Sequence, residues 1–345
     1  MENNHLQNWI NKRKERRNSL TADSLVDRLR NGDREALATA ITLIESTRSE
    51  DLKLANAIID ACLEVKNDSI RIGITGVPGV GKSTFIEAFG KFLAEKQLKI
   101  AVLAIDPTSQ ATGGSILGDK TRMQELSQLK NVFIRPSAAG QTLGGVARKT
   151  RETIHLCEAA GYDIIIIETV GVGQSEIMVH SMVDFFMLLM LSGAGDELQG
   201  IKRGIMEMAD ALVITKSDGD NSKNALSAAK EYAGALHLFP PKPSGWTTPC
   251  FTCSAIENKN IDKAWEHIEK YISKTHQNGW FSANRSKQDQ FWLQESLKEM
   301  ILADFFQSDA WKNEYNLMEN KVTNGEISAF TAAELLYTTY KKSRK

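Results

Sequence analysis

The sequence has few cysteines, and their spacing excludes a disulfide-stabilised fold. Only Cys62, Cys157, Cys250 and Cys253 occur in 345 residues, which is too few and too scattered for a disulfide framework. Cys250 and Cys253 form one Cys-x-x-Cys pair, but no second pair or histidine ligand stands nearby. Ordinary buried thiols are therefore favoured over a zinc or redox site at this pair.

Excess charge and long apolar runs are also missing. The formal net charge is −1, which provides no field for nucleic acid, and the basic runs at 12–17 and 341–345 lie at the two ends of the chain, where solvated tails are expected. The most apolar run, 185–191, is too short to span a bilayer, and residues 1–10 are polar rather than signal-like. We expect a cytoplasmic protein with neither a nucleic-acid nor a membrane partner.

What the sequence does contain is a complete phosphate-binding loop. Residues 76–83 read G-x-x-x-x-G-K-S. The preceding segment, 69–75, is short, apolar and β-branched, and the following segment, 83–94, carries apolar side chains at helical spacing. A strand, this loop and a helix in succession form the context in which the motif binds nucleotide phosphates.

The residue types of the loop explain its chemistry. Glycines allow successive backbone N–H groups to turn inward around the β-phosphate, and the helix N-terminus adds partial positive charge. Lys82 is expected to reach the β- and γ-phosphates, and Ser83 to offer its hydroxyl to Mg²⁺. The residues expected to contact the nucleotide here are Gly76, Val77, Pro78, Gly79, Val80, Gly81, Lys82, Ser83 and Thr84.

Acidic residues follow two further apolar strands. The predicted strand 99–105 ends at Asp106, and the predicted strand 162–167 leads into Glu168. The carboxyl ends of parallel strands meet at one sheet edge, beside the nucleotide. This position favours Mg²⁺ or water positioning for Asp106 over the capping of a turn, and it makes Glu168 the second acidic motif of a nucleotide-hydrolysing protein.

Three glycine-bearing segments lie between these elements. Residues 111–122 have the composition of a loop that reorders around a γ-phosphate. Residues 138–148 are glycine-rich again, and helical spacing returns over 150–160. Gln174 is either the residue that orients the attacking water, because its amide both donates and accepts, or a solvated loop residue. The third segment, 192–204, contains Asp196 and Lys202, and its residues alone indicate a flexible turn with an ion pair.

A base-recognition motif follows the predicted strand 211–215. The carboxylate of Asp218 matches the N1 and N2 donors of guanine, whereas adenine presents no matching donors, so Asp218 predicts selection of GTP over ATP. Lys216 is expected to pack its stem along the base or the phosphate loop. After a last short strand, 249–252, a backbone contact to guanine O6 is expected from Ser254, Ala255 and Ile256.

The alternation of strands and helices predicts an α/β fold of the P-loop NTPase type, with a mostly parallel sheet covered by helices on both faces. We expect an N-terminal helical extension over 1–66, a nucleotide domain over 67–275 and a C-terminal helical arm over 276–345. An apolar stripe at 292–306 in the arm either packs on its own nucleotide domain or forms a homodimer.

Four motifs together resemble one protein family. These are the phosphate loop, Asp-Pro-Thr-Ser at 106–109, Glu-Thr-Val-Gly-Val-Gly-Gln-Ser-Glu at 168–176 and Gly-Ala-Gly-Asp-Glu-Leu-Gln-Gly-Ile-Lys at 193–202. With them the chain resembles the MeaB/ArgK family from about residue 32 to its end. The resemblance implies a GTPase that binds GTP, GDP and Mg²⁺ and escorts adenosylcobalamin-dependent acyl-CoA mutases, chiefly methylmalonyl-CoA mutase. Such proteins gate cofactor loading and protect the mutase.

The resemblance also implies roles for particular residues. Asp106, Asp119 and Glu168 would be the metal and water acids. Asp196 and Lys202 would lie in a third switch loop that responds to the mutase. The family's pattern further implies a homodimer formed through the C-terminal arm.

Two departures and two alternatives accompany this resemblance. Thr215 replaces the usual asparagine of the Asn-Lys-x-Asp motif, and the threonine is expected to hold the loop less well. Asn260 stands where a glycine is common.

A nickel metallochaperone GTPase should show a histidine-rich or multi-cysteine tract, yet the N-terminal region has only His5. An ArgK-type kinase should show a second substrate motif, and none is visible. No Asp-x-His-x-x-Gly signature is present, so the chain is not expected to hold cobalamin itself.

Overall fold

A computed structural model provides the structure of the protein. It describes residues 21–46, 48–65, 68–105, 123–136, 143–169, 175–193, 203–307 and 309–343. Seven strands form one sheet in the order β3-β2-β4-β1-β5-β6-β7, and all of its strand pairs are parallel, which confirms the predicted fold class. The strands are β1 (Ile70–Gly76), β2 (Ile100–Ile105), β3 (Val132–Arg135), β4 (Ile164–Thr169), β5 (Phe185–Met190), β6 (Ala211–Ile214) and β7 (Cys250–Thr252).

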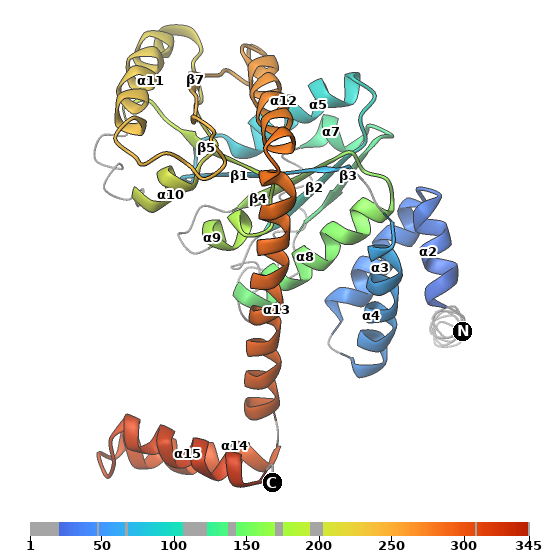
Figure 1. The fold of residues 1–345 in the computed structure, drawn as a ribbon, viewed down its shortest axis with the longest axis vertical. Helices are drawn as coiled ribbons and strands as arrows, with labels where there is room; N and C mark the ends of the chain where they lie inside the picture. Colours follow the sequence, from blue (N-terminus) through green and yellow to red (C-terminus); the bar gives the residue numbers. More distant parts are fainter. Residues whose placement is uncertain are drawn as a thin grey trace, which may run out of the picture. The chain divides into compact units, whose positions relative to one another are not determined.

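The central strands are apolar along their whole length because helices cover both faces of the sheet. All residues of β4 and β5 are buried. On one face, α5 (Lys82–Glu95) and α12 (Ile261–Gln277) pack over a core that includes Phe85 and Phe89, whose ring centroids lie 5.6 Å apart. Figure 1 shows α8 (Leu143–Ala159) and α9 (Ser175–His180) on the opposite face. Parallel strands buried on both sides read as continuous apolar runs.

The second face carries a further core cluster near β5 and β6. Leu188 and Leu212 point into it, whereas their neighbours Leu189 and Val213 belong to the first cluster, as expected from the two-residue period of a strand. The helices that cover it are α10 (Arg203–Met208) and α11 (Ser222–Leu236). A short helix, α7 (Gln124–Ser127), packs on α5 and β3.

The predicted start of α8 was wrong. The glycine-rich segment was expected to remain a loop as far as Arg148, with a helix from residue 150, but α8 begins at Leu143. Glycine costs about 1 kcal/mol relative to alanine in a helix interior, which is why the pattern favoured a loop. Val146 and Ala147 are buried within this first part of the helix, and that burial offsets the cost.

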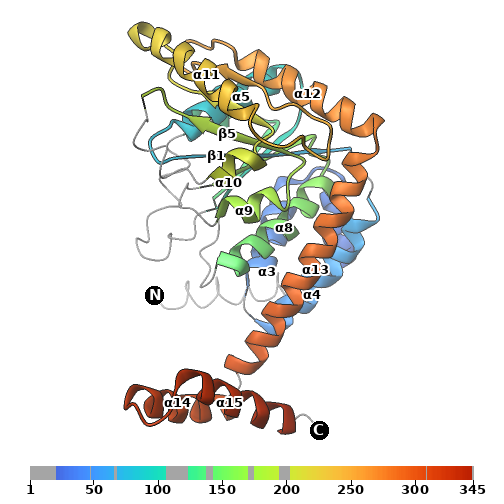
Figure 2. The same ribbon diagram turned by 60° about the vertical axis from the view of Figure 1, so that its left-hand side comes forward.

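Three N-terminal helices pack on one another and on α8: α2 (Ala22–Arg30), α3 (Arg34–Glu45) and α4 (Ser49–Leu63). In Figure 2, α3 and α4 lie beside α8. Asp33 caps α3 by accepting hydrogen bonds from the backbone N–H groups of Glu35 and Ala36 at 2.8 and 3.1 Å, and Asp is among the residues preferred at this position. The hydrogen bond from Ala36, and then that from Arg28, lowers the pKa of Asp33.

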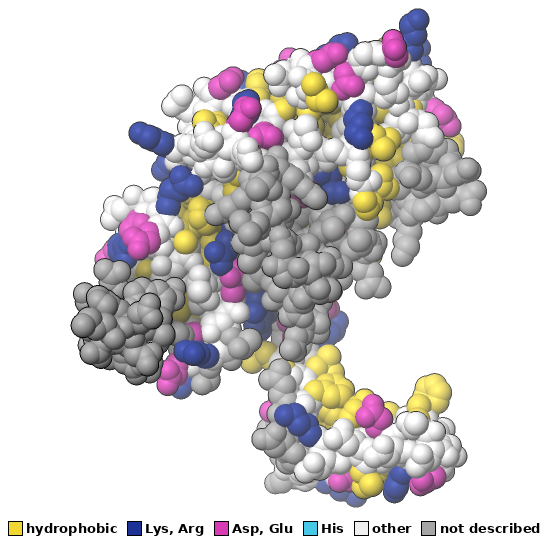
Figure 3. Space-filling model, turned by 180° about the vertical axis from the view of Figure 1, so that it is seen from behind, with side chains coloured by type: hydrophobic (Ala, Val, Ile, Leu, Met, Phe, Trp, Pro, Cys, Tyr) yellow, Lys and Arg dark blue, Asp and Glu magenta, His cyan; other side chains and the backbone are white. Residues whose placement is uncertain are grey.

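The chain divides into two compact units, Met1–Gln288 and Asp289–Lys345. The first contains the whole sheet and the N-terminal helices, and α13 (Trp280–Gln307) runs from the first unit into the second, which also holds α14 (Asp309–Thr323) and α15 (Ala329–Ser343). Hydrophobic side chains are exposed on the second unit (Figure 3). The most exposed of them are Leu293, Met300, Phe330 and Tyr337. Within the described ranges, no helix has the length and apolarity needed to cross a membrane.

Candidate nucleotide-binding site

The parallel sheet brings the predicted site residues to one edge. The phosphate loop follows β1, Glu168 lies near the end of β4, Asp218 lies in the loop after β6, and Ser254 follows β7. These four positions come from distant parts of the chain, and their strands end side by side because all of them run in the same direction. Carboxyl edges of open α/β sheets are where such folds bind ligands.

The phosphate loop has a backbone that requires glycine at its start. Gly76 has φ +154°, and a Cβ at this position would lie 2.5 Å from the carbonyl oxygen of Leu189. Gly81, with φ +95°, caps the N-terminus of α5 in a left-handed conformation. The Nζ of Lys82 donates hydrogen bonds to the carbonyl oxygens of Gly76 at 2.8 Å and Val77 at 3.2 Å. The ammonium group is therefore held inside the curve of the loop, at the start of a helix whose dipole favours anions.

Ser83 and Glu168 meet beside this loop. The Ser83 hydroxyl donates a hydrogen bond to Oε1 of Glu168 at 3.0 Å, and Glu168 is buried. Behind them, the hydroxyl of Thr169 donates to that of Thr75 at 2.8 Å and ties β4 to β1. A hydroxyl and a carboxylate are the hard oxygen donors that Mg²⁺ takes in nucleotide sites, so the residues present fit this ion.

Five of the predicted site residues lie outside the described residues. They are Asp106, Asp119, Gln174, Asp196 and Lys202. Their assignments remain predictions from the sequence.

Thr215 connects the base-recognition loop to the phosphate loop. Its hydroxyl lies 2.7 Å from the carbonyl oxygen of Val80 and 3.1 Å from that of Met190. The backbone N–H of Thr215 already donates to Met190 at 2.8 Å, and a hydroxyl has one hydrogen to give. The shorter bond to Val80 is therefore the one we assign to the hydroxyl. This link was missed in the sequence, where threonine was expected only to hold the loop less well than asparagine.

Asp218 is oriented by the loop after β7. Its Oδ2 accepts a hydrogen bond from the Ser254 hydroxyl at 2.9 Å, and the same hydroxyl accepts one from the backbone N–H of Glu257 at 3.1 Å. Ser254 is fully buried, and Asp218 is half-buried. Since the serine hydroxyl is fixed by two bonds, it fixes the carboxylate in turn.

The other residues expected to contact the base follow Ser254. Ala255 is half-buried, whereas the side chain of Ile256 is 77% exposed. Asn260 has φ +60° and its Nδ2 donates to the carbonyl oxygen of Thr252 at 2.8 Å. Asparagine is among the few non-glycine residues that adopt this left-handed conformation readily, which explains how it replaces the glycine common at this position.

Lys216 adopts a strained backbone conformation next to the phosphate loop. Its φ is +53°, in the left-handed region that L side chains rarely adopt. Its Cε lies 3.9 Å from the position that a Cβ on Gly81 would occupy. The lysine stem therefore lies beside Gly81 of the phosphate loop, and its contact with the base stays a prediction.

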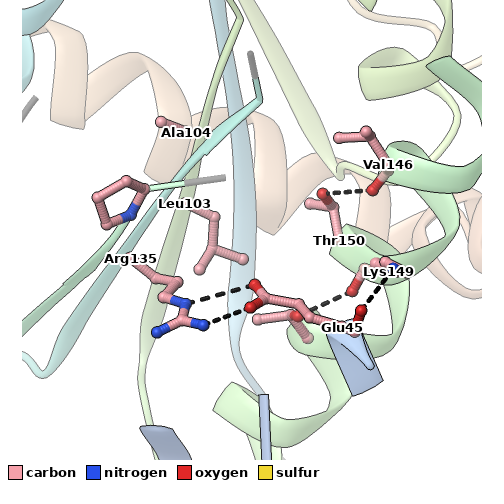
Figure 4. A pocket seen from close by; sticks show the side chains of 9 residues that line it. Glu45, Leu103, Ala104, Arg135, Val146, Lys149 and Thr150 are labelled. Atoms are coloured by element: carbon pink, nitrogen blue, oxygen red, sulfur yellow. Dashed lines mark hydrogen bonds and ion pairs between the residues drawn. The ribbon is translucent and has the colours of Figure 1, made fainter. Parts of the chain in front are cut away.

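A separate small hollow lies where β2 and β3 end (Figure 4). The carboxylate of Glu45, at the end of α3, pairs with Arg135, and its main-chain oxygen accepts a hydrogen bond from Lys149 of α8 at 2.7 Å. These charged groups already bind one another, so we assign the hollow to the junction between the N-terminal helices and the sheet. Its lining residues are Glu45, Leu103, Ala104, Arg135, Pro136, Val146, Lys149, Thr150 and Thr153.

The Cys-x-x-Cys pair does not have the surroundings of a reactive site. Burial raises the pKa of both Cys250 and Cys253 to about 12, so both thiols are protonated at neutral pH. The thiolate is the form that attacks disulfides and binds metals. In the part of the chain that the structure describes, no group of three or more His, Cys, Asp and Glu side chains is placed to hold a metal.

Comparison with known families shows which family the chain belongs to. A family model described as "Methylmalonyl Co-A mutase-associated GTPase MeaB" matches residues 37–310. The chain belongs to the MeaB family. The resemblance predicted from four motifs is thereby confirmed, and the enzyme is a P-loop GTPase that binds guanine nucleotide.

Similar proteins cover nearly the whole chain of this MeaB-family GTPase. A "Putative GTPase" of Caulobacter vibrioides is 47% identical over 322 residues, which span 93% of this chain and 98% of that protein. The mouse "Methylmalonic aciduria type A homolog, mitochondrial" is 45% identical over 92% of this chain and 79% of its own. A crystal structure titled "LAO/AO transport system kinase" is 36% identical with a TM-score of 0.73, covering 93% of this chain and 97% of that one.

Proposed function

We propose that this GTPase acts as a chaperone of an adenosylcobalamin-dependent acyl-CoA mutase, chiefly methylmalonyl-CoA mutase, and uses GTP hydrolysis to gate cofactor loading and to protect the mutase. The observation that carries the proposal is the family match over residues 37–310, whose description names the mutase. The relatives named for methylmalonic aciduria type A support it. Asp196 and Lys202 are the residues proposed to respond to the mutase.

Guanine selection is proposed for Asp218. One carboxylate oxygen of this residue would accept from N1–H of guanine and the other from the N2 amino group. The buried Ser254 hydroxyl supports this role because it holds the carboxylate in place. Adenine offers no donor pair to a carboxylate in this position, and a site built for a hydrogen bond rejects a ligand that lacks it by a large factor.

Hydrolysis is proposed to depend on groups around the phosphate loop. Backbone N–H groups of the loop would hold the β-phosphate, and Lys82 would neutralise charge on the β- and γ-phosphates. Ser83 and Glu168 would hold Mg²⁺, together with Asp106 and Asp119, and the bound ion supplies further positive charge toward the phosphates. Gln174 is the proposed residue for orienting the attacking water.

A homodimer is proposed through the second compact unit. Leu293, Met300 and Phe330 are 72%, 62% and 89% exposed on it, and large exposed apolar side chains on so small a unit indicate a protein partner. Light scattering should give twice the chain mass of 38.3 kDa, and Phe330→Asp should lower it. Leu238→Asp, at an 81% exposed leucine of the first unit, is the matched control. A monomeric wild type would contradict the dimer.

The mutase role is tested by titration. Steady-state GTP turnover should rise as purified methylmalonyl-CoA mutase is added, because the switch residues would be ordered by the partner. Lys82→Ala GTPase in the same titration shows that the phosphate release comes from this site. An unchanged rate across the full titration would contradict the chaperone proposal and leave a GTPase without this client.

A further inference from the structure

Asn221 bridges two loops of the nucleotide site. Its Nδ2 donates a hydrogen bond to the main-chain oxygen of Lys216 at 2.7 Å, and its Oδ1 accepts one from the hydroxyl of Ser192 at 2.8 Å. Ser192 follows β5, and Lys216 follows β6. The asparagine itself directly precedes α11, where it is the N-cap residue. One side chain therefore joins the exits of two adjacent strands.

The amide has only one orientation that satisfies both neighbours. The carbonyl of Lys216 can only accept a hydrogen bond, so the NH₂ group must face it, and the Ser192 hydroxyl then donates to the remaining oxygen. The backbone N–H of Asn221 also donates to the carbonyl oxygen of Asp218 at 3.1 Å. The residue thus holds the base-recognition loop at two of its carbonyl groups.

The bond to Lys216 acts on a strained residue. With φ at +53°, Lys216 has a conformation that only glycine adopts without cost, and the conformation places its stem along the phosphate loop. The next residue but one is Asp218, so the turn at Lys216 also sets where the carboxylate lies. A loop held in this way needs a partner that stabilises the turn.

We propose that Asn221 is a positioning residue for guanine-nucleotide binding, which keeps Lys216 in the left-handed turn so that its stem covers the phosphate loop and Asp218 meets the base. Ser192 orients the Asn221 amide for this task. The inference rests on the proposed roles of Asp218 and Lys216 in the same site. Asn221 and Ser192, which lie outside the recognised motifs, would thereby help to set the dissociation rate of the nucleotide.

The test measures dissociation of the fluorescent nucleotide mant-GDP from the full chain. Asn221→Asp keeps the size of the side chain and the acceptor for Ser192, but it places an anionic oxygen against the Lys216 carbonyl. Loss of this hydrogen bond, together with the repulsion between the carboxylate and the carbonyl oxygen, should speed dissociation about 10-fold. Ser192→Ala should have a smaller effect of about 2- to 3-fold, because the Lys216 bond remains possible. The melting temperature of nucleotide-free protein should change little, since Asn221 is only half-buried and its side chain makes no capping hydrogen bond to α11.

Asn224→Asp is the matched control. Asn224 is exposed on the same helix, and its side chain has no hydrogen bond to the described residues, so this variant makes the same change of charge without touching the base loop. Its mant-GDP dissociation rate should stay within about 2-fold of wild type, as for other surface substitutions. A rate for Asn221→Asp no faster than that of Asn224→Asp would overturn the inference.

Two double variants, in which Asn221→Asp is combined with a substitution of Lys216, separate a positioning role of Asn221 from a general loss of structure. Glycine takes the left-handed turn freely, so in Lys216→Gly the effect of Asn221→Asp should shrink to about 2-fold, whereas in Lys216→Ala it should persist at about 10-fold. Equal effects in both backgrounds would overturn the inference. A wild type that retains no mant-GDP would overturn the proposed guanine site and this inference with it, while tight wild-type binding with an unchanged Asn221→Asp rate overturns the inference alone.

Discussion

The two edges of the sheet carry similar charged side chains that have different partners. At the amino edge, Arg71 at the start of β1 forms two hydrogen-bonded contacts with Glu158 of α8 at 2.8 and 2.9 Å. Arg285 of α13 binds Asp184 in the same bidentate way at 2.8 and 2.6 Å. At the carboxyl edge, Lys82 contacts carbonyl oxygens and Glu168 contacts a hydroxyl.

The amino-edge network is closed by further bonds between its own members. The hydroxyl of Ser69 donates to Glu158 at 2.7 Å, and the backbone N–H of Arg71 donates to Asp184 at 2.9 Å. Arg285 also donates to the carbonyl oxygen of Ser69 at 2.7 Å. Ionised partners in fixed forks neutralise one another, although Nη1 of Arg71 has no hydrogen-bond partner among the described residues. At the carboxyl edge, the hydrogen bonds described for Lys82 and Glu168 go to carbonyl oxygens and to a hydroxyl, which a charged ligand is able to replace.

The comparison teaches that a charged residue at a strand end does not by itself indicate function. Arg71 and Glu158 are as buried as Lys82 and Glu168. The difference lies in the hydrogen bonds that the structure describes. Arg71 and Glu158 bind each other inside the fold, whereas Lys82 binds the phosphate loop and Glu168 binds the Ser83 hydroxyl, where a nucleotide and its metal ion are proposed to bind. Substitutions of one kind at both edges should therefore have opposite consequences.

The largest effect is expected at the carboxyl edge. Lys82→Ala removes the cation proposed for the β- and γ-phosphates and should lower single-turnover GTP hydrolysis on the order of 10²- to 10³-fold, the usual loss for one preorganised group. Lys91→Ala, at an exposed lysine of the same helix that pairs with Glu125, is the control and should leave the rate unchanged. A Lys82→Ala rate within about 2-fold of wild type would remove the phosphate loop from the mechanism.

The sharpest form of the comparison uses one substitution at both edges. Glu158→Gln leaves the Arg71 guanidinium group without its carboxylate and should lower the free energy of unfolding by about 3–5 kcal/mol, the usual cost of breaking a buried pair. Glu168→Gln should cost less stability and instead lower GTP hydrolysis. Urea unfolding and single-turnover hydrolysis of both variants provide the measurement.

The reverse pattern would break the comparison. A stable Glu158→Gln variant with impaired hydrolysis, together with an unstable but active Glu168→Gln variant, would mean that the partners do not determine the role of these charges. The two variants make the same change of one oxygen for an amide group, so neither side-chain size nor overall charge distinguishes them.

A smaller effect is expected for the pH dependence of stability. Burial alone would raise the pKa of Glu158, but the hydrogen bond with His155 and the charge and hydrogen bonds of Arg71 hold this pKa well below its ordinary value of 4.5. The carboxylate therefore adds stability above pH 4.5, and this contribution is lost as the pH falls toward the lowered pKa, because the unfolded chain takes up the proton first.

His155 should make the loss of stability on acidification begin at a higher pH. Burial lowers its pKa from 6.5, so the unfolded chain binds a proton more readily than the folded one when the pH falls below that value. Urea unfolding between about pH 4 and pH 8 should show stability that declines below about pH 6.5 and again below about pH 4.5. Glu158→Gln should flatten the lower limb. Stability independent of pH over this range would contradict the described network.

Much of the nucleotide site was predictable because it consists of local motifs at strand ends. Buried parallel strands are apolar runs, so the predicted strands end within about two residues of the observed ones, and the phosphate loop, Glu168 and Asp218 follow them at fixed places. The Thr215 link to Val80 and the Asn221 bridge were not predictable. A polar side chain shows its role only when the fold supplies its partner, here 135 residues away for Thr215 and Val80.

The amino-edge network was missed for the same reason. In the sequence, Asp184 only interrupts the start of an apolar run, and nothing marks Glu158 or Arg285 as its neighbours. The start of α8 was mispredicted because glycine content was given more weight than the burial of the next apolar residues. Local patterns reveal elements and motifs, whereas long-range pairs depend on the topology.

The central claim, that one carboxylate beside the phosphate loop chooses the purine, is tested most directly by calorimetric binding of GTP, ATP and XTP to wild type and Asp218→Asn. The account predicts that wild type prefers GTP, and that Asp218→Asn loses GTP affinity by about 100-fold while its ATP affinity is unchanged. The variant should gain XTP, because the amide NH₂ can donate to the O2 that xanthine carries in place of the amino group of guanine. Equal losses for GTP and ATP, with no gain of XTP, would contradict it.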